Sequence, residues 1–447
     1  MELLDEREVH ELAASYAGGL AALGCATGDA VAVCEENTAR FVAARDATAA
    51  LGLRLVPLHP RLAPPEIAHA LATAWARVLV SDREIIAPPT RTIGFEALAR
   101  LAAPRSIARP VGPGATILFT SGTTGRAKGC LRDESAETAR IAEITRTYRI
   151  SADDVHLIAC PLPHSAPGAF LRAARGAGAR TVLLPRFEPE AFLRAVATHR
   201  ATLSFLVPTQ VARLLALPRG AADWSSVRAI VVAGAPFAPA TKSAFLDWLG
   251  PGRLWEFYGS SEAGTITVAA PATQPGEPGF VGYPPAGVEI RLEHVDARGV
   301  GQIFVRSPSV MRGYLGPDPG EWRDGFFGTG DLGRHDGRGG LVLVDRMNDT
   351  IITGGVNVYP AEVERALAEH PGVRGAVVVG APHPEWGEEV CAVVVADVPE
   401  ADLRAFLRER IAPFKIPKRF RFVDLADLPT GPSGKPIRRA ARPWFTD

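Results

Sequence analysis

Apolar positions change repeatedly between helical spacing and short unbroken runs from the start of the chain to about Ser81. The helical stretches are residues 6–24, 38–52 and 64–76, and the apolar runs are residues 29–36, 53–60 and 77–82. We expect helices over the former and buried strands over the latter. Helices that alternate with fully apolar strands are typical of a parallel sheet covered on both faces.

The pattern is interrupted once and then resumes. Residues 82–113 are proline-rich and show neither period, so we expect irregular structure there. A strand over 115–119 leads into a glycine- and threonine-rich loop, and a helix is expected over 134–148. Alternation then continues from Val155 to about Val268, with strands expected over 155–159, 180–185, 202–208 and 227–234.

The helical period disappears between Pro271 and Leu315, where residues 287–295 and 301–308 predict antiparallel strands. Strands over 374–382 and 388–397 and a helix over 400–411 then predict a compact α+β tail. We expect an α/β fold with a large N-terminal domain of parallel-sheet subdomains plus a small β-barrel, and a smaller mobile α+β C-terminal domain. The expected boundaries are 1–346 and 347–447.

Composition and charge exclude several classes of function. The 447 residues include 49 Lys+Arg and 49 Asp+Glu, so no net field favours nucleic acid or an anionic membrane. The 5 cysteines show no C-x-x-C spacing, which argues against a disulfide framework or zinc site and fits a reducing cytoplasm. Neither a signal-peptide pattern nor an apolar run long enough to cross a membrane is present.

The loop from Thr120 to Gly129, "TSGTTGRAKG", carries the first sign of chemistry. Glycines let backbone N–H groups approach an anion, hydroxyls add donors, and Lys128 adds a charge in a chain whose basic residues are mostly arginine. A flexible surface loop is the alternative. The spacing fits neither a Walker A loop nor G-x-G-x-x-G, so we expect a phosphate site of another kind.

This loop resembles the phosphate-loop signature of the adenylate-forming (ANL) superfamily, and the chain resembles its AMP-dependent acyl-CoA synthetases. Five further motifs follow in the family's order: "AGAP" (233–236), "YGSSEAG" (258–264), "GTGDLG" (328–333), "DRMNDTIITGG" (345–355) and "PTGPSGK" (429–435). The resemblance covers nearly the whole chain and implies ATP, Mg²⁺ and CoA as cofactors.

The resemblance implies a nucleotide site. Its ATP- and AMP-binding residues would be Thr120, Ser121, Gly122, Thr123, Thr124, Gly125, Lys128, Gly234, Ala235, Pro236, Tyr258, Gly259, Ser260, Asp331 and Arg346. Tyr258 would lie against adenine, Ser261 would bind phosphate, and Glu262 would hold Mg²⁺, for which a carboxylate is a suitable ligand. Asp331 would bind the ribose hydroxyls, with Arg346 as a second contact. Turn and surface roles are the alternatives for each residue alone.

The mobile domain would supply the catalytic lysine. By resemblance, Lys435 bridges the substrate carboxylate and the α-phosphate, where a cation offsets the charge of the attack. Asn348 stands where the family most often has Asp or Lys at its hinge, and Asn tolerates unusual backbone angles. Gly354 and Gly355 would line the CoA tunnel after the domain rotates.

The segment "CPLPHSAPGAF" (160–170) matches one wall of the family's acyl pocket, with His164 at a position where many CoA ligases have histidine. A packed core histidine and a Cys160–His164 nucleophile pair are the alternatives. Phe257 stands where malonate-type ligases carry Arg, and the segment lacks the Asp of amino-acid-activating members. We therefore expect a short or medium fatty acid or an aryl acid as the substrate.

The expected reaction has two halves: carboxylate and ATP form acyl-AMP and pyrophosphate, and CoA then takes the acyl group. Two alternatives remain open, an adenylating enzyme that loads a carrier protein or another acceptor, and an inactive ATP/AMP-binding sensor. Ala127 replaces the usual proline of the loop, and the chain starts later than the family usually does, so one edge of the first subdomain is expected to be trimmed.

Overall fold

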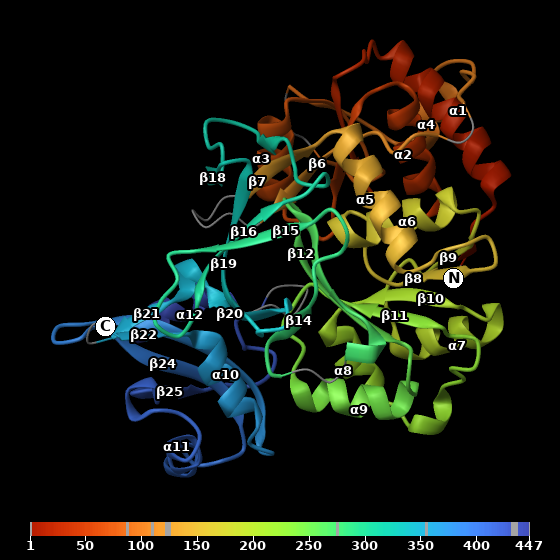
Figure 1. The fold of residues 1–447 in the computed structure, drawn as a ribbon. Helices are drawn as coiled ribbons and strands as arrows, with labels where there is room; N and C mark the ends of the chain where they lie inside the picture. Colours follow the sequence, from red (N-terminus) through yellow and green to blue (C-terminus); the bar gives the residue numbers. More distant parts are fainter. Residues whose placement is uncertain are drawn as a thin grey trace.

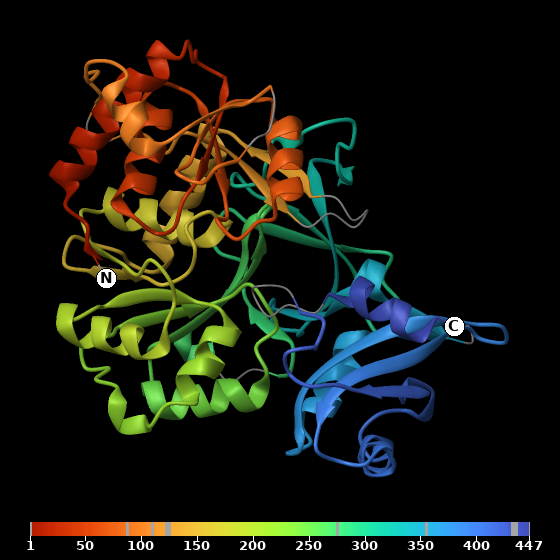
Figure 2. The ribbon, with the colours of Figure 1, turned by 180° about the vertical axis from the view of Figure 1, so that it is seen from behind.

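A computed structural model of the chain describes residues 2–85, 89–108, 111–120, 127–273, 277–353, 356–430 and 437–446. Its α/β part is built around two mainly parallel sheets, next to an antiparallel third sheet and a smaller C-terminal α+β part (Figure 1). The C-terminal part lies against the side of the third sheet, and the same arrangement is seen from behind in Figure 2.

The first sheet comes from the first third of the chain except for one short strand, β17. Its strands are β2 (Ala30–Cys34), β3 (Arg54–Leu58), β4 (Ala76–Val80), β5 (Arg91–Ile93), β6 (Ala115–Thr120), β7 (Lys128–Arg132) and β17 (Gly313–Tyr314), and its helices are α1 (Glu6–Ala22), α2 (Ala39–Ala50), α3 (Pro64–Ala74) and α4 (Phe95–Arg100). The strand order is β17-β7-β6-β3-β2-β4-β5, with β2 to β6 parallel and β7 and β17 antiparallel to their neighbours.

Strand β2 shows why this sheet forms. All its residues are buried: Val31 and Val33 pack against α1, α2 and α4, whereas Ala30, Ala32 and Cys34 pack toward α3 on the opposite face. Because successive side chains of a strand point to opposite faces, an unbroken apolar run requires cover on both. The expected alternation of helices and buried strands is confirmed here.

The second sheet repeats this plan. Its strands are β1 (Glu2–Leu3), β8 (Val155–Ile158), β9 (Arg180–Leu183), β10 (Leu203–Leu206), β11 (Ala229–Val232), β12 (Leu254–Ser260) and β13 (Gly264–Ala269), and its helices are α5 (Glu134–Thr147), α6 (Ser165–Gly176), α7 (Pro189–His199), α8 (Pro208–Leu215) and α9 (Pro239–Leu249). The order is β1-β9-β8-β10-β11-β12-β13, with β8 to β12 parallel. Helices α5 and α6 cover one face, and α7 to α9 the other.

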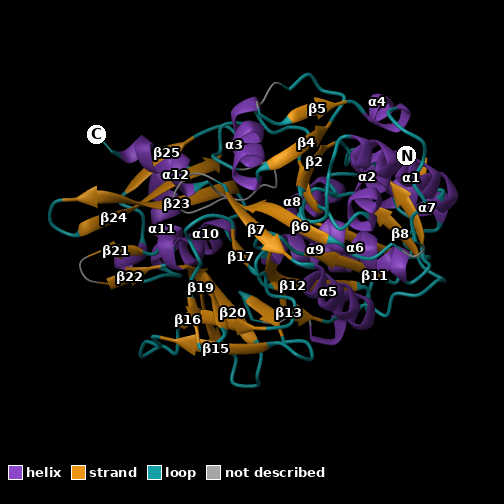
Figure 3. Ribbon diagram, turned by 90° about the horizontal axis from the view of Figure 1, so that it is seen from above, coloured by secondary structure: helices purple, strands orange, loops and turns teal. Residues whose placement is uncertain are grey.

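Antiparallel strands dominate the rest of the chain. The third sheet contains β14 (Phe280–Gly282), β15 (Glu289–Glu293), β16 (Gly301–Arg306), β18 (Trp322–Arg323), β19 (Phe326–His335) and β20 (Leu341–Arg346). The fourth contains β21 (Ile351–Thr353), β22 (Val356–Val358), β23 (Val373–His383), β24 (Gly387–Ala396) and β25 (Arg419–Phe422), with helices α10 (Pro360–Ala368), α11 (Glu400–Arg408) and α12 (Arg438–Ala441). From above, the fourth sheet lies at one side, away from α1, α2 and α4 (Figure 3).

Two expectations are corrected. Residues 82–113, expected to be irregular, contain β5 and α4, which are too short to establish a period in the sequence. The glycine-rich loop does not pass directly toward a helix: β7 follows it and pairs antiparallel with β6, so the loop joins two strands. Within the described residues, no helix is both long and apolar enough to cross a membrane.

Candidate active site

Residues from distant motifs meet where the first three sheets adjoin. Thr120, at the end of β6, donates its hydroxyl hydrogen bond to Glu262 Oε1 over 2.9 Å, although 142 positions separate them. Tyr258 on β12 donates from its hydroxyl to Asp331 Oδ2 on β19 over 2.6 Å. Arg346, the last residue of β20, lies 3.0 Å from Asp331 Oδ1. The structure thus brings the expected phosphate, magnesium and ribose residues into one region.

The tight hairpin between β12 and β13 presents Glu262. Ser260 Oγ accepts a hydrogen bond from the Ala263 N–H over 3.0 Å, and Gly264 has a φ of 73°, in the left-handed region that favours glycine. A Cβ on Gly259 would lie 2.1 Å from the Gly264 carbonyl oxygen, so this crossing requires glycine. The "YGSSEAG" motif is therefore a compact turn with Glu262 near its tip.

The Glu262 carboxylate has a second hydroxyl neighbour that the sequence did not suggest. The Tyr314 hydroxyl on β17 donates to Glu262 Oε1 over 2.9 Å. Burial, followed by the nearby charge of Glu262, raises the pKa of Tyr314 far above its ordinary value, so the phenol remains a donor. Carboxylate and hydroxyl oxygens are hard ligands that fit Mg²⁺.

Lys128 lies opposite Thr120 in the β6–β7 pair and is itself paired with an acidic side chain. Its Nζ donates to Asp318 Oδ2 over 2.5 Å and lies 5.1 Å from the centroid of the Tyr314 ring. The hydrogen bond from Lys128 lowers the pKa of Asp318. Lys128 begins β7, so a strand rather than a free loop holds it near Glu262.

Asp331 is the centre of the expected ribose contact. It is 8% exposed, and its backbone N–H donates to Thr329 Oγ1 over 3.1 Å, which helps to hold the loop-like bulge of β19. Burial and then the charge of Asp331 raise the pKa of Tyr258 well above its usual range. The charge of Asp331 also raises the pKa of Arg346. An anionic acceptor is thus held between a neutral phenol and a guanidinium.

The "AGAP" segment lies directly after β11, on the side where the parallel strands of the second sheet end. Gly234 has a φ of 93°, which favours glycine, while Ala235 and Pro236 continue the turn. Ligands of parallel α/β sheets bind beyond the carboxyl ends of the strands. The segment thus lies at the end of the sheet where such ligands bind, and its adenine contact stays a prediction.

The two acyl-pocket candidates have different neighbours. His164 caps the start of α6, its ring centroid lies 5.5 Å from that of His59, and it lines a narrow cavity between α6 and the first sheet. Phe257 instead lies 6.0 Å from the ring of Phe205 and 6.4 Å from that of Phe170, on the other face of α6.

The alternative nucleophile, Cys160, is in an unsuitable environment. Its side chain is buried, and its thiol lies 2.9 Å from Gln210 Oε1. Burial is the main cause that raises the pKa of Cys160 to about 12, so the reactive thiolate is disfavoured. The geometry does not support a Cys160–His164 pair.

Several expected residues lie outside the described residues: Ser121, Gly122, Thr123, Thr124, Gly125, Gly354, Gly355 and Lys435. The backbone of Asn348 belongs to the 3₁₀ turn Met347–Asp349. Arg438 on α12 pairs with Asp349 of this turn over 2.7 Å and with Glu364 on α10 over 2.8 Å. These ion pairs fasten the turn to the helices that pack on the fourth sheet.

Comparison with known proteins gives a consistent result. Residues 6–315 match the family model described as AMP-binding enzyme, and residues 362–435 match the AMP-binding enzyme C-terminal domain. A feruloyl-CoA synthase from Amycolatopsis is 35% identical, covering 98% of this chain and 93% of that protein. A 2-succinylbenzoate–CoA ligase from Bacillus licheniformis is 33% identical, covering 96% and 92%.

Other similar proteins include a carrier-protein ligase and an amide bond synthetase. A fatty acid–[acyl-carrier-protein] ligase, ScoC, from Streptomyces coeruleorubidus is 32% identical over 99% of this chain and 92% of its own length. Among solved structures, ATP-bound MatB from Rhodopseudomonas palustris superposes with a TM-score of 0.87 at 30% identity, covering 99% of this chain and 94% of that one. The amide bond synthetase McbA from Marinactinospora thermotolerans gives 0.85 at 32%, covering 99% and 95%.

Proposed function

Because the chain belongs to the AMP-binding enzyme family and is an AMP-forming acid–thiol ligase, we propose that it activates an aryl acid with ATP and transfers the acyl group to coenzyme A. The observation that carries the proposal is the meeting of Thr120, Glu262 and Asp331 at the junction of three sheets. This region offers hard oxygen ligands next to an anionic acceptor for a sugar.

In the first half-reaction, a carboxylate oxygen of the acid attacks the α-phosphorus of ATP. The bond from that phosphorus to the bridging oxygen breaks, and pyrophosphate leaves with the electron pair. Glu262 and the Thr120 hydroxyl would hold Mg²⁺, which neutralises charge on the phosphates when it is bound. Lys128 would exchange Asp318 for a phosphate oxygen, and Lys435 would bridge carboxylate and α-phosphate.

Asp331 would orient the nucleotide during this step. Its two oxygens accept from Tyr258 and Arg346, and each oxygen keeps lone-pair capacity for a ribose hydroxyl. Tyr258 and Arg346 hold the carboxylate in place, so it need not reorganise when ATP arrives. This would position the α-phosphate for in-line attack.

In the second half-reaction, the CoA thiolate attacks the acyl carbonyl carbon and AMP departs. We propose that the C-terminal part first rotates about Asn348 to bring Gly354 and Gly355 to the site. Polar contacts between described residues join the two parts at this point: Tyr359 receives a 3.2 Å hydrogen bond from Arg298, and the Ala361 N–H donates to Asp345 over 2.7 Å. Water can replace such contacts, which supports a rotation of low cost.

The surroundings of Phe257 favour an aryl acid. Phe170 on α6 and Phe205 on β10 pack against Phe257, and Tyr148 at the end of α5 lies 5.1 Å from Phe170, so aromatic rings from the second sheet and its covering helices gather there. Aromatic rings favour offset or edge-on contact with another ring. Relatives named for feruloyl and 2-succinylbenzoate substrates support the same class. Short or medium fatty acids are the second group to test.

A pyrophosphate-release screen tests this proposal. The enzyme, Mg·ATP and a panel of aryl, aliphatic and amino acids are assayed with and without CoA, and the acyl product is identified by mass spectrometry. We expect aryl acids to give the highest kcat/KM and CoA to stimulate AMP release. Glu262→Gln is the control for metal-dependent turnover. Absence of CoA-stimulated AMP release with every acid would overturn the CoA assignment.

The acceptor has a specific alternative, because ScoC acts on a carrier protein and McbA is an amide bond synthetase. Parallel reactions that contain CoA, a holo-acyl carrier protein or an amine separate the three acceptors. Acyl-AMP that accumulates with CoA but is consumed by carrier protein or amine would favour the alternative. Absence of pyrophosphate release with every acid would instead support an inactive nucleotide-binding sensor.

A further inference from the structure

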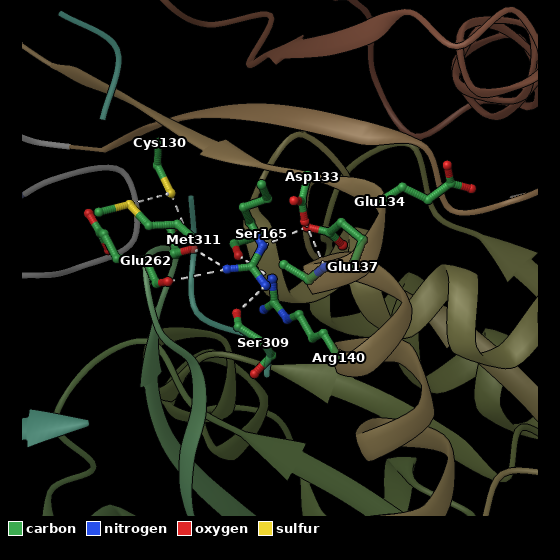
Figure 4. Close-up of polar contacts among 12 residues, drawn as sticks. Cys130, Asp133, Glu134, Glu137, Arg140, Ser165, Glu262, Ser309 and Met311 are labelled. Atoms are coloured by element: carbon green, nitrogen blue, oxygen red, sulfur yellow. Dashed lines mark hydrogen bonds and ion pairs between the residues drawn. The ribbon is translucent and has the colours of Figure 1, made fainter. Parts of the chain in front are cut away.

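Strand β7 follows the expected phosphate loop and runs behind the Ser261–Glu262 turn, which carries the expected metal ligand Glu262. Cys130 and Arg132 are two positions apart on this strand, so their side chains share one face. The Cys130 thiol lies 3.5 Å from the Ser261 carbonyl oxygen and 3.3 Å from Met311 Sδ. Figure 4 shows Cys130, Met311 and Glu262 on one side of the polar cluster that lies behind the site.

Arg132 connects this turn to two other segments. Its side chain is fully buried, and its Nη1 donates to the carbonyl of Ser261 over 2.8 Å and makes a longer, 3.4 Å contact to that of Glu262. Nη2 donates to the Ser309 carbonyl over 2.6 Å, and Nε donates to Glu137 Oε1 over 2.6 Å. One flat guanidinium thus holds the backbone on which Glu262 is mounted.

Glu137 anchors Arg132 from helix α5. The carboxylate also accepts from Arg172 on α6, and both partners are buried. Burial by itself would raise the pKa of Glu137, but Arg172, Arg132 and Arg140 outweigh it and lower the pKa to about 2. The anchor therefore stays anionic throughout the physiological range.

The same cluster reaches the acyl wall. Arg140 on α5 donates to Ser165 Oγ over 2.7 Å, at the first residue of α6 and next to His164 (Figure 4). The cluster of Arg132, Glu137, Arg140 and Arg172 therefore contacts both the turn that carries Glu262 and the start of α6. We call it the α5 cluster.

We propose that Arg132 is a positioning residue that holds the Ser261–Glu262 turn in its metal-binding geometry, with Glu137 as its anchor. The inference rests on the proposed role of Glu262. Arg132 suits this task because its donors lie in one rigid fork, whereas the compact ammonium of lysine cannot span the same carbonyl and carboxylate acceptors together. Replacing the Arg132 guanidinium loosens the Ser261–Glu262 turn but leaves in place every group proposed to contact metal or nucleotide.

The test compares Arg132→Lys with Arg172→Lys. Both substitutions keep the charge and disturb the same Glu137 carboxylate, but none of the contacts in the described part of the chain joins Arg172 to the Ser261–Glu262 turn. Arg172→Lys is therefore a matched control for general loss of stability. Thermal melts of both variants show whether the two are comparably folded.

The main measurement is Mn²⁺ binding by electron paramagnetic resonance in the presence of α,β-methylene-ATP, which needs no turnover. We expect Arg132→Lys to weaken Mn²⁺ affinity about 10-fold or more, as is typical when support of a metal ligand is lost. Arg172→Lys should retain wild-type affinity. In pyrophosphate release, Arg132→Lys should raise the Mg²⁺ requirement and lower kcat, with the KM for the acid unchanged.

Equal Mn²⁺ affinity of Arg132→Lys and wild type, or equal losses in the two variants, would overturn the inference. If Arg132→Lys does not fold, Glu137→Gln takes its place: it must weaken Mn²⁺ binding more than Arg172→Lys does, because it removes the charge that anchors Arg132, whereas Arg172→Lys leaves that carboxylate in place. The proposed function fails in a different way, since the wild-type enzyme would then release no pyrophosphate with any acid, whatever the Mn²⁺ affinities of the variants.

Discussion

Asp331→Asn gives the sharpest test of the nucleotide site. Asn keeps an oxygen that can accept from the buried Tyr258 hydroxyl, so the substitution removes charge while retaining shape. Arg346, the charged partner lost by this change, has a side chain that is 54% exposed, so solvent already screens that pair. We therefore expect a loss of stability of at most about 1 kcal/mol.

The effect on ATP should be larger. A hydrogen bond to a charged group contributes about 1.5–3 kcal/mol and a neutral one about 0.5–1.5, so each ribose hydroxyl loses about 1–1.5 kcal/mol when Asn replaces Asp331. Two hydroxyls give about 2–3 kcal/mol, which corresponds to a rise in the KM for ATP of about 30- to 150-fold. The kcat at saturating ATP should change much less, because the contact lies away from the reacting phosphorus.

The assay is pyrophosphate release with ATP and with 2′,3′-dideoxy-ATP. Both enzymes should lose affinity when the hydroxyls are removed, but the loss should be about 30- to 150-fold smaller for Asp331→Asn, because the charged part of the interaction is already absent. Asp324→Asn is the matched control: it removes an 83% exposed carboxylate that pairs with Arg291 in the same region of the chain. If dideoxy-ATP weakens both enzymes by the same factor, Asp331 does not bind the ribose.

Three further results are expected. His156 is fully buried, and burial lowers its pKa from 6.5 to about 4, so protonation of His156 favours the unfolded state. The free energy of unfolding should therefore fall as the pH falls from 6.5 toward 4, by about 2 kcal/mol between pH 7 and 5. His156→Gln should remove that part of the pH dependence in urea unfolding. Phe170→Ala should cost about 3–5 kcal/mol in the same assay and shift the acid panel toward bulkier substrates, and a cost near zero would contradict the packing. Lys435→Ala should abolish acyl-AMP formation but spare thioester formation from supplied acyl-AMP, and adenylation that survives the change would refute its role.

The pattern of apolar and polar residues was sufficient to predict most of the helices and strands. Strands such as β2 are unbroken apolar runs because both of their faces are covered, and that requirement is visible residue by residue. Elements β5 and α4 escaped prediction because three and six residues do not establish a period. Strand β7 was missed because its lysine and arginine conceal the alternation of a strand that is only partly apolar.

The motifs predicted most of the described site, because chemistry on a phosphate and a ribose demands particular residues in local order. Glu262, Asp331 and Tyr258 were all expected in one site, and the structure brings them together with Thr120. Tyr314 was not expected, since it lies 52 positions from its partner Glu262 and has no motif role that we recognised. Asp318, the partner of Lys128, was overlooked for the same reason.

The sequence by itself determined the fold class, the family and the kinds of groups in the site, since these depend on local periodicity and short motifs. Only the tertiary structure decided how the groups are paired. Lys128 is held by Asp318, Glu262 is shared by Thr120 and Tyr314, and Arg132 is buried behind the Ser261–Glu262 turn. In the sequence Arg132 looks like any other arginine, because burial and charge pairing arise only when distant segments pack together.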